Sequence, residues 1–263
     1  MYKNKAVWIT GASSGIGEYV AYEMARAGAS LILSARRREE LERVSKRCVE
    51  AGLSEDNILV LPLDVADEAS LQSAVAMAQA FKGKIDMLYN NAGISQRSLC
   101  LDTDMSVYRK LFEVDVFGQI ALTKLVLPIM LERGEGHIAV TSSVAGKVGV
   151  QLRTGYCAAK HAVMGFFDAL RAEVAKDGIF VTTVTPGFIR TAIAENALAG
   201  DGSKFGKVDK NIAGGMDVED CAAVIMKGFM ARKREIAVGK GKEMKALWLK
   251  RVLPNMFFSQ VEK

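Results

Sequence analysis

The chain has 263 residues, half of them apolar, with 35 basic and 30 acidic side chains and a formal net charge of +5. This length and apolar content suit one large α/β domain, and the scattered basic residues give no argument for nucleic-acid binding. Four separated cysteines without a CxxC pair and only two histidines disfavour a disulfide framework, a metal site and a Ser-His-Asp triad. Such cysteines are typical of reduced thiols, so we expect a cytoplasmic protein.

Short apolar runs alternate with longer helical patterns along the chain. The predicted strands are Ala6–Ile9, Leu31–Ser34, Ile58–Leu61, Met87–Tyr89, His137–Thr141, Phe180–Val184 and Ile236–Val238. The predicted helices are Ile16–Ala27, Arg38–Ala51, Glu68–Phe81, Val107–Glu132, Gly155–Ala175 and Val218–Ala231. This alternation predicts a Rossmann-type doubly wound parallel sheet of about seven strands with helices on both faces. We expect one domain over residues 1–263.

Two segments qualify this regular pattern. Pro128 lies inside the predicted helix Val107–Glu132 and is expected to kink or divide it. The stretch 190–216 is rich in glycine, alanine and charge and follows a strand end, where ligands bind in open α/β sheets. We interpret it as a mobile substrate lid, with an inert surface loop as the alternative. No segment looks long and apolar enough to cross a bilayer.

A glycine-rich run from Thr10 to Gly17 joins the first predicted strand to the first predicted helix. Its glycines permit a tight turn and the close approach of a pyrophosphate, and the helix N-terminus offers N–H groups to an anion. After the second strand, the chain reads Ser34-Ala35-Arg36-Arg37-Arg38, with no acid to hold a ribose hydroxyl. Because a guanidinium can clamp a 2′-phosphate, NADP(H) is favoured over NAD(H), with Arg36 as the leading residue.

Tyr156 and Lys160 are four residues apart, and Ser143 lies thirteen residues before Tyr156. On a helix both side chains share one face, and the ammonium favours a phenolate that can exchange a proton with a carbonyl or alcohol oxygen. Ser143 could hydrogen-bond the same oxygen. A solvated surface pair is the alternative. However, residues 155–170 are small or apolar nearly all round, which predicts a buried helix.

Together the glycine run, Ser143, Tyr156 and Lys160 resemble the single-domain type of the short-chain dehydrogenase/reductase family. The similarity covers almost the whole chain, with supporting motifs at Leu63-Asp64-Val65, Asn90-Asn91-Ala92-Gly93 and Pro186-Gly187. The runs 93–98 and 201–206 look most similar to the branch called dehydrogenase/reductase member 7 and 7B.

The resemblance implies a role for each matching position. Tyr156 would be the acid/base, Ser143 would position the substrate oxygen, and Lys160 would also hydrogen-bond the nicotinamide ribose. Asp64 and Val65 would contact the adenine, residues 90–93 would line the cofactor and support the sheet, and residues 186–191 would hold the carboxamide side. The implied cofactor-binding residues are Gly11, Ser13, Ser14, Gly15, Ile16, Gly17, Arg36, Arg37, Asp64, Val65, Asn91, Ala92, Gly93, Tyr156, Lys160, Pro186, Gly187, Ile189 and Thr191.

One position departs from the family pattern. The resemblance implies an asparagine in the fourth helix, in a Val-Asn-Val-x-Gly-like context, where it would hold a helix distortion and a proton-relaying water. Here the run is Val114-Asp115-Val116-Phe117-Gly118. Asp115 cannot donate as an amide does, but it can accept hydrogen bonds or stabilise the charge of Lys160. We expect retained activity with an altered pH profile, and we count Asp115 among the catalytic candidates.

These residues predict an NADP(H)-dependent oxidoreductase that moves a hydride between nicotinamide and a carbonyl or secondary alcohol. A catalytically weak nucleotide-sensing or scaffold protein is the alternative, and only Asp115 favours it. The predicted rim of the substrate site is mostly apolar, which suggests a lipophilic ketone, alcohol or quinone, although lid packing would use the same side chains. The rim residues are Val144, Val148, Val150, Leu152, Phe188 and Ile193.

The C-terminal segment 242–263 mixes apolar and basic residues around Pro254 and reads as amphipathic. We expect it to pack on a neighbouring subunit or over the pocket, with membrane-surface contact as the less favoured alternative. The apolar helices Val107–Leu131 and Gly155–Ala175 are broad enough to bury a face on a second copy. The resemblance implies a homodimer or homotetramer.

Overall fold

The computed structural model describes residues 2–207 and 209–262. Positions 1 and 263, at the ends of the expected domain, and position 208 of the predicted lid lie outside the described residues. In the described part, the sheet has the order β3-β2-β1-β4-β5-β6-β7, and every neighbouring pair is parallel. The strands are β1 (Ala6–Thr10), β2 (Ser30–Ser34), β3 (Ile58–Val60), β4 (Met87–Asn90), β5 (Gly136–Thr141), β6 (Ile179–Pro186) and β7 (Glu235–Val238).

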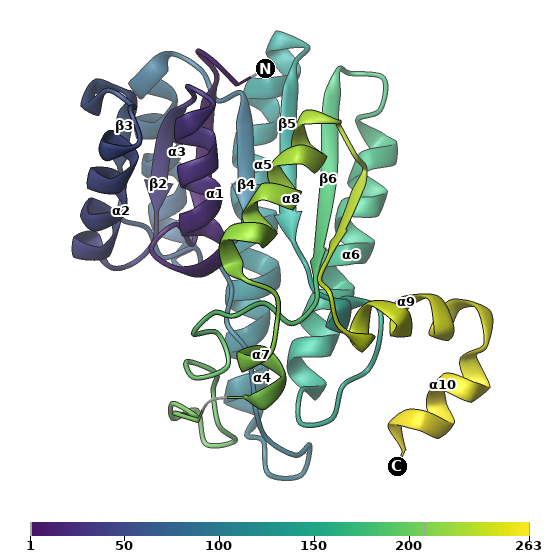
Figure 1. The fold of residues 1–263 in the computed structure, drawn as a ribbon. Coiled ribbons are helices and arrows are strands. Elements are labelled where there is room, and N and C mark those ends of the chain that lie inside the picture. The colour runs from purple at the N-terminus through teal and green to yellow at the C-terminus, as the bar shows by residue number, and fades with distance from the viewer. Residues whose placement is uncertain (1, 208, 263) are drawn as a thin grey trace.

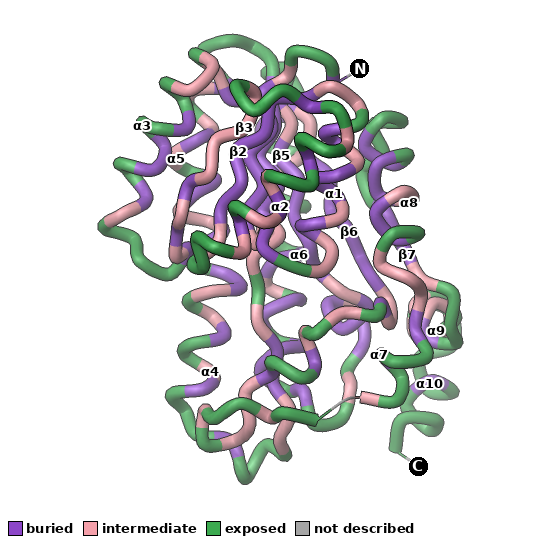
Figure 2. The backbone as a smooth tube through the Cα atoms, turned by 60° about the vertical axis from the view of Figure 1, so that its left-hand side comes forward, coloured by how far each residue is buried: buried purple, intermediate pink, exposed green. Residues whose placement is uncertain are grey.

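Helices cover both faces of this sheet (Figure 1). Their bounds are α1 (Gly15–Arg26), α2 (Arg38–Glu50), α3 (Glu68–Lys82), α4 (Met105–Phe112), α5 (Gly118–Arg133), α6 (Thr154–Glu173), α7 (Lys210–Ala213), α8 (Val218–Met230), α9 (Lys242–Val252) and α10 (Pro254–Val261). Side chains alternate across each strand, so Val7 packs in the core under α1, α2 and α8, and Trp8 packs in the core under α3, α5 and α6. Figure 2 shows the central strands as a buried layer. The predicted Rossmann-type fold is confirmed.

The strand order reverses at β1, because β2 lies on one side of it and β4 on the other. Val7 lies beside Leu31 of β2 on one side and Met87 of β4 on the other. Ligands bind outside the carboxyl ends of the strands at such a reversal. The glycine-rich run after β1 and the Asn-Asn-Ala-Gly motif after β4 therefore meet at this edge.

The predicted helix Val107–Glu132 is divided, but not at Pro128. A π-helical turn, Glu113–Phe117, separates α4 from α5, and α5 continues through Pro128 to Arg133. The π-turn is the position of Asp115, whose buried side chain accepts a hydrogen bond from Ile94 N at 2.7 Å. A π-turn inserts one extra residue, a feature often found at functional sites.

Judged by length and hydropathy alone, the expectation that no segment could cross a bilayer is wrong. The continuous helical stretch from Met105 to Arg133 has 29 residues and contains an 18-residue window of mean hydropathy 1.6. In this fold the stretch supplies core side chains, including Leu122 and Val126, to the layer under α3 and α6. Burial against a sheet covered on both faces explains the same apolar composition.

The predicted lid contacts the loop that follows β4. Arg97 N donates to Leu198 O at 2.8 Å, and Asp104 N donates to Gly200 O at 2.9 Å. The short helix α7 belongs to this segment and lies at the lower end of Figure 1. The predicted lid therefore lies at the end of the molecule where the carboxyl ends of the strands lie.

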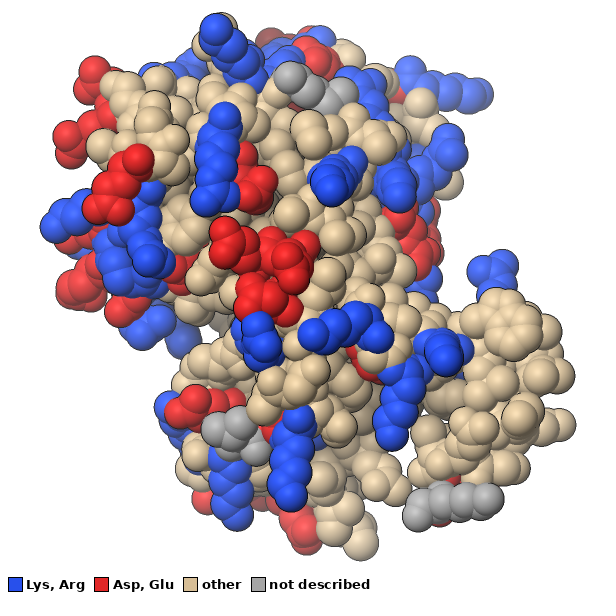
Figure 3. Space-filling model, in the orientation of Figure 1, with Lys and Arg blue, Asp and Glu red and all other residues tan. Residues whose placement is uncertain are grey.

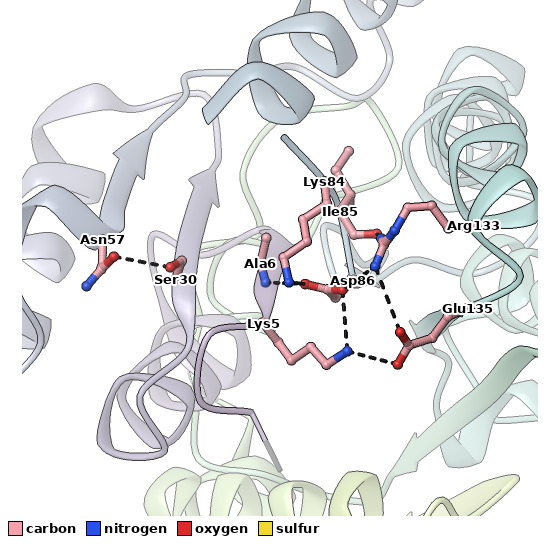
Figure 4. A network of polar contacts seen from close by, with 9 residues as sticks. All are labelled: Lys5, Ala6, Ser30, Asn57, Lys84, Ile85, Asp86, Arg133 and Glu135. Carbon is pink, nitrogen blue, oxygen red and sulfur yellow. Dashed lines mark hydrogen bonds and ion pairs between the residues drawn. The ribbon is translucent and has the colours of Figure 1, made fainter. Parts of the chain in front are cut away.

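At the amino ends of the strands, the buried carboxylate of Asp86 connects neighbouring elements (Figure 4). Asp86 accepts hydrogen bonds from Ala6 N and Arg133 Nη2, both at 2.7 Å, and Lys84 Nζ lies 3.1 Å away. Burial favours the neutral acid, but these hydrogen bonds and the Lys5 charge hold the pKa of Asp86 below its usual range. Asp86 thus joins β1 to the end of α5.

We expect Asp86→Asn to lower the free energy of unfolding by about 1–3 kcal/mol at neutral pH, because the amide removes the negative charge and replaces one of the two acceptor oxygens with an NH2 donor. A carboxylate whose pKa is depressed in the folded state stabilises above its unfolded pKa, and this stabilisation disappears as pH falls through the folded pKa. Urea unfolding at neutral and acidic pH should therefore show a difference that shrinks in acid. Asp56→Asn, at an exposed position, is the control. An equal loss at both pH values would contradict the assignment.

Candidate active site

Lys160 and Asp115 form a fully buried ion pair between α6 and the π-turn. Lys160 Nζ lies 3.3 Å from Asp115 Oδ2 and donates to Thr141 O at 3.1 Å. A Cβ atom on Gly93 would approach both Lys160 Nζ and Asp115 Oδ1 to 3.3 Å, so a larger residue here would require the pair to shift by a few tenths of an ångström. The structure thus places Asp115 next to Lys160, one of the two arrangements considered from the sequence.

Electrostatics favour a charged lysine at this position. Burial lowers the pKa of Lys160, but the Asp115 carboxylate more than offsets this and holds it above the ordinary value. Burial raises the pKa of Asp115, against the attraction of Lys160 and the hydrogen bond from Ile94 N. Asp115 Oδ2 makes no hydrogen bond within the described parts of the chain, so the ion pair is its main compensation.

Tyr156 and Lys160 lie on the buried face of α6. The Tyr156 side chain is buried in a small apolar cluster with Val107 and Leu111, and Lys160 Nζ is 5.7 Å from the centre of its ring. The helix as a whole is less buried than its composition indicates, because Ala158, His161 and Gly165 are exposed on the other face. Small side chains do not distinguish a core face from a face open to solvent or to another chain.

Ser143 lies at the end of β5, at the start of a 3₁₀ turn, Val144–Gly146. Its hydroxyl accepts a hydrogen bond from Ala145 N at 3.1 Å, and its own proton remains available to an acceptor. The neighbouring Ser142 hydroxyl donates to Lys160 O at 3.0 Å and fixes the turn against α6. Strand β5 and helix α6 therefore hold Ser143, Tyr156 and Lys160 at one edge of the sheet.

The glycine-rich run has the backbone that a pyrophosphate site needs. Gly11 and Gly15 adopt positive φ values of 65° and 59°, which suit glycine. A Cβ atom on Gly11 would come within 2.8 Å of the Ala92 backbone. Ser14 begins α1 without a side-chain cap, so the first N–H groups of α1 are free to meet an anion. Ser13, Ile16 and Gly17 complete this run, and a dinucleotide phosphate fits it.

Asn91 supports this run from β4. Its Nδ2 donates to Thr10 O at 3.2 Å and to Gly11 O at 3.3 Å, and its Oδ1 accepts from Thr141 at 3.0 Å. Asn90 is fully buried and donates to Thr123 Oγ1 at 2.9 Å. This hydrogen bond links β4 to α5, in agreement with the expected role of Asn90 in supporting the sheet.

Glu18 and Arg43 also support the run, although neither belongs to a recognisable sequence motif. Arg43 pairs with the buried Glu18 at 2.7 Å and donates to Ser13 O at 3.2 Å. The pair links α1 to α2 across 25 positions in sequence. Only a predicted contact between α1 and α2 could have indicated it.

Arg36 and Arg37 follow β2 and are exposed, where a nucleotide at the reversal of the sheet would place its adenosine ribose. No ion pair involves either guanidinium within the described residues, whereas Arg38 lies 3.6 Å from Glu42. Asp64 and Val65 follow β3, and Asp64 Oδ1 accepts from Ala66 N at 3.1 Å. The exposed guanidiniums of Arg36 and Arg37 are therefore open to an anionic group.

The loop after β6 approaches the glycine-rich run. A Cβ atom on Gly15 would lie 3.2 Å from Thr191 Cγ2, which shows how near this loop comes to the glycine run. Pro186 ends β6, Ile189 is buried, and Gly187 N donates to Val238 O at 2.8 Å. The predicted cofactor residues of four separate motifs thus lie along one edge.

Two of the predicted rim residues have a packing role. Val144 and Val148 are buried against Phe257 of α10, and Lys250 of α9 donates to Lys147 O at 2.6 Å. The C-terminal segment therefore packs on the turn that follows Ser143. Part of it stays open, and the uncharged surface of α10 forms the lobe at the lower right of Figure 3. Its exposed apolar residues, with those of α9, are Trp248, Val252, Leu253, Met256, Phe258 and Val261.

A parallel seven-stranded sheet with a glycine-rich first turn and a Ser-Tyr-Lys set at its carboxyl edge is the arrangement expected for the short-chain dehydrogenase/reductase class. The family model for short chain dehydrogenases matches residues 5–201. The chain belongs to this family of oxidoreductases.

Relatives agree with this assignment. The chain is 54% identical over 201 residues to dehydrogenase/reductase SDR family member 7 from Homo sapiens, an alignment that covers 75% of this chain and 59% of that protein. It is 38% identical over 259 residues to family member 7B from Mus musculus, which covers 97% and 80% of the two chains. The predicted resemblance to members 7 and 7B is confirmed.

The fold also resembles solved structures. A short chain dehydrogenase/reductase from Burkholderia phymatum, solved in complex with NAD, superposes with a TM-score of 0.83 at 24% identity. The superposition covers 98% of this chain and 96% of that one. At this identity the likeness establishes the fold.

Proposed function

We propose that the protein is an NADP(H)-dependent oxidoreductase acting on a carbonyl or secondary alcohol. The observation that carries this proposal is the buried Tyr156–Lys160 pair on α6, beside Ser143 and at the same sheet edge as the glycine run. Buried groups of this kind are costly unless they are paired or used, and here they face the crevice that suits a nucleotide.

The residues divide the chemistry among them. The nicotinamide cofactor, when bound, supplies or accepts the hydride. In the reducing direction the C=O π bond breaks, and the substrate oxygen takes the hydroxyl proton of Tyr156 while Ser143 donates a hydrogen bond to it. The ammonium of Lys160 stabilises the resulting phenolate, which regains a proton from solvent. Asp115 keeps that ammonium charged from behind and acts as a positioning residue.

The cofactor preference rests on Arg36 and Arg37. We expect Arg36→Ala to raise KM for NADPH about 10- to 100-fold, the loss of one or two charge-assisted hydrogen bonds, with little change for NADH. Initial rates with each cofactor measure this, and Arg38→Ala is the control because Arg38 already pairs with Glu42. Equal effects on NADPH and NADH would show that Arg36 does not read the 2′-phosphate, and NAD(H) would then be the cofactor.

A carbonyl panel followed by NADPH absorbance tests the proposed function. Ketones, aldehydes and quinones with apolar chains should consume NADPH at rates above the cofactor blank. Nucleotide binding without turnover on any of them would instead favour the nucleotide-sensing or scaffold alternative. The choice of lipophilic compounds follows the apolar side chains near the site, among them Val150 and Phe188.

The oligomeric state and location extend the proposal. An apolar hollow of about 650 Å³ lies on the outer side of α4, lined by residues that include Met105, Tyr108, Phe112 and Phe117. With the exposed face of α6, this surface supports a homodimer or homotetramer, which light scattering would measure.

The packing of Phe257 beside the Ser143 turn favours a covering role for the C-terminal segment over membrane contact. The cytoplasmic location stays a prediction.

A further inference from the structure

Two arginines and one aspartate form a buried cluster beside Tyr156. Arg97 lies in the loop after β4, Arg153 directly precedes α6, and Asp209 precedes α7 in the predicted lid. Each arginine side chain is 9% exposed and that of Asp209 is 12% exposed. Arg153 Nη2 donates to Asp209 Oδ2 at 3.4 Å, and Arg97 Nη2 pairs with the same oxygen. We call these three residues the arginine cluster.

The charges of the arginine cluster do not balance. Two guanidiniums share one carboxylate, and the described residues bring no second carboxylate into ion-pair distance of either. Burial and the neighbouring Arg153 lower the pKa of Arg97 to about 10, and burial also lowers the pKa of Arg153. Burying an excess positive charge is costly without a partner, so holding the lid in place does not by itself explain a second arginine.

An unused hydrogen-bond donor also indicates that the arginine cluster has room for a further partner. Arg153 Nε is buried and makes no hydrogen bond to any described residue. A guanidinium carries five N–H donors in a planar fork, an arrangement that matches the oxygens of a carboxylate or phosphate. The cluster therefore has both the charge and the donors to hold one further oxyanion.

The position of the arginine cluster connects it with the reacting group. Arg153 Cζ lies 5.9 Å from the centre of the Tyr156 ring, and Arg97 is anchored to the lid through Leu198. We propose that Arg97 and Arg153 bind an oxyanionic group of the substrate, so that the carbonyl or alcohol compound also carries a carboxylate or phosphate. This inference rests on the proposed oxidoreductase function and names its substrate class.

Asp209 competes with such an anion for the two arginines. Its carboxylate also accepts from Asn211 N at 2.8 Å and Ile212 N at 3.4 Å, where it caps α7. Asparagine is an equally good helix cap but carries no charge. The Asp209→Asn variant should therefore keep α7 and bind an anionic substrate more tightly than the wild type.

The test compares linear keto acids, with one to four methylene groups between ketone and carboxylate, with their methyl esters. The wild type should prefer the best acid over its ester in kcat/KM by about tenfold or more, from charge-assisted hydrogen bonds. Arg97→Gln and Arg153→Gln should each lower this acid-to-ester ratio several-fold, to a value near one, because each removes charge-assisted hydrogen bonds to the anion. Arg109→Gln, at an exposed position on α4, removes the same charge and should leave the ratio unchanged. Keto-alkyl phosphates and the corresponding keto alcohols form a parallel arm that distinguishes phosphate from carboxylate.

Binding provides a readout that does not depend on turnover. Calorimetric titration of the acid and the ester into the Tyr156→Phe variant with NADPH should show tighter binding of the acid, and Asp209→Asn in that background should strengthen it. If a glutamine variant fails to fold, the lysine variant at that position keeps the charge and should retain part of the preference. Equal binding of both anions and their neutral counterparts, with ratios unaffected by Arg97 and Arg153, would overturn the anion assignment. That result would leave ketone reduction intact, whereas absence of turnover on every carbonyl would count against the proposed function alone.

Discussion

Replacing Tyr156 with phenylalanine should lower kcat about 10²–10⁴-fold, the range for loss of a positioned acid/base. The ring would still fill its place in the cluster with Val107 and Leu111, so the fold should remain intact. NADPH should bind nearly as well as to the wild type, because the glycine run and the residues after β6 carry most of the nucleotide contacts in this proposal. Steady-state rates and a fluorescence titration of NADPH measure the two quantities separately.

Tyr108→Phe is the matched control for this prediction. Tyr108 also lies near the start of α6, where its hydroxyl is 2.8 Å from Thr154 Oγ1, but no role in proton transfer is assigned to it. This variant should retain turnover. Loss of NADPH binding together with turnover in Tyr156→Phe would instead indicate that Tyr156 has a structural role.

Replacing Lys160 with methionine should lower the free energy of unfolding by about 3–5 kcal/mol, because it leaves the Asp115 charge buried without a partner. Burial already raises the pKa of Asp115, and loss of the ammonium removes the main opposing attraction. An acid whose folded pKa is raised destabilises the fold once pH rises through that pKa. The deficit, measured by denaturant unfolding, should therefore be larger at alkaline than at acidic pH.

Variants of Asp115 complete this test. The double variant Asp115→Leu, Lys160→Met should recover much of the lost stability, because no buried charge remains. Asp115→Asn can still accept the hydrogen bond from Ile94 N, but it leaves the Lys160 charge without its carboxylate. Without the carboxylate the pKa of Lys160 falls, so the lysine loses its charge at lower pH, and alcohol oxidation should lose rate at the alkaline end of its pH–rate profile. If Asp115→Asn changes neither the rate nor its pH dependence, Asp115 has no part in proton transfer.

The layers of the fold follow from local patterns in the sequence. Apolar strands bounded by glycine and helices of regular period predict βαβ units, and the observed strands agree with the predicted ones to within two residues at their ends. The glycine run and Ser143 follow strand ends, and Tyr156 and Lys160 lie on one face of the helix after Ser143. Their common edge could therefore be predicted from topology alone.

Other features depend on contacts that no local pattern encodes. The π-turn at Glu113–Phe117 arises where Asp115 meets Ile94 and Lys160, 21 and 45 positions away, so Pro128 was the wrong place to expect the division. The arginine cluster joins three loops whose sequences show no shared motif. Exposure of the second face of α6 could not be read from its small side chains, because alanine and glycine occur in both environments.

Transfer of deuterium from the cofactor to the product tests the central claim most directly. The protein would be incubated with NADPH carrying deuterium at the transferable position and with the best ketone of the panel, and the product alcohol would be analysed by mass spectrometry. The account predicts one deuterium on the carbinol carbon with the wild type and a rate of its appearance that falls with Tyr156→Phe. Product without deuterium, or deuterium transfer that does not depend on Tyr156, would contradict it.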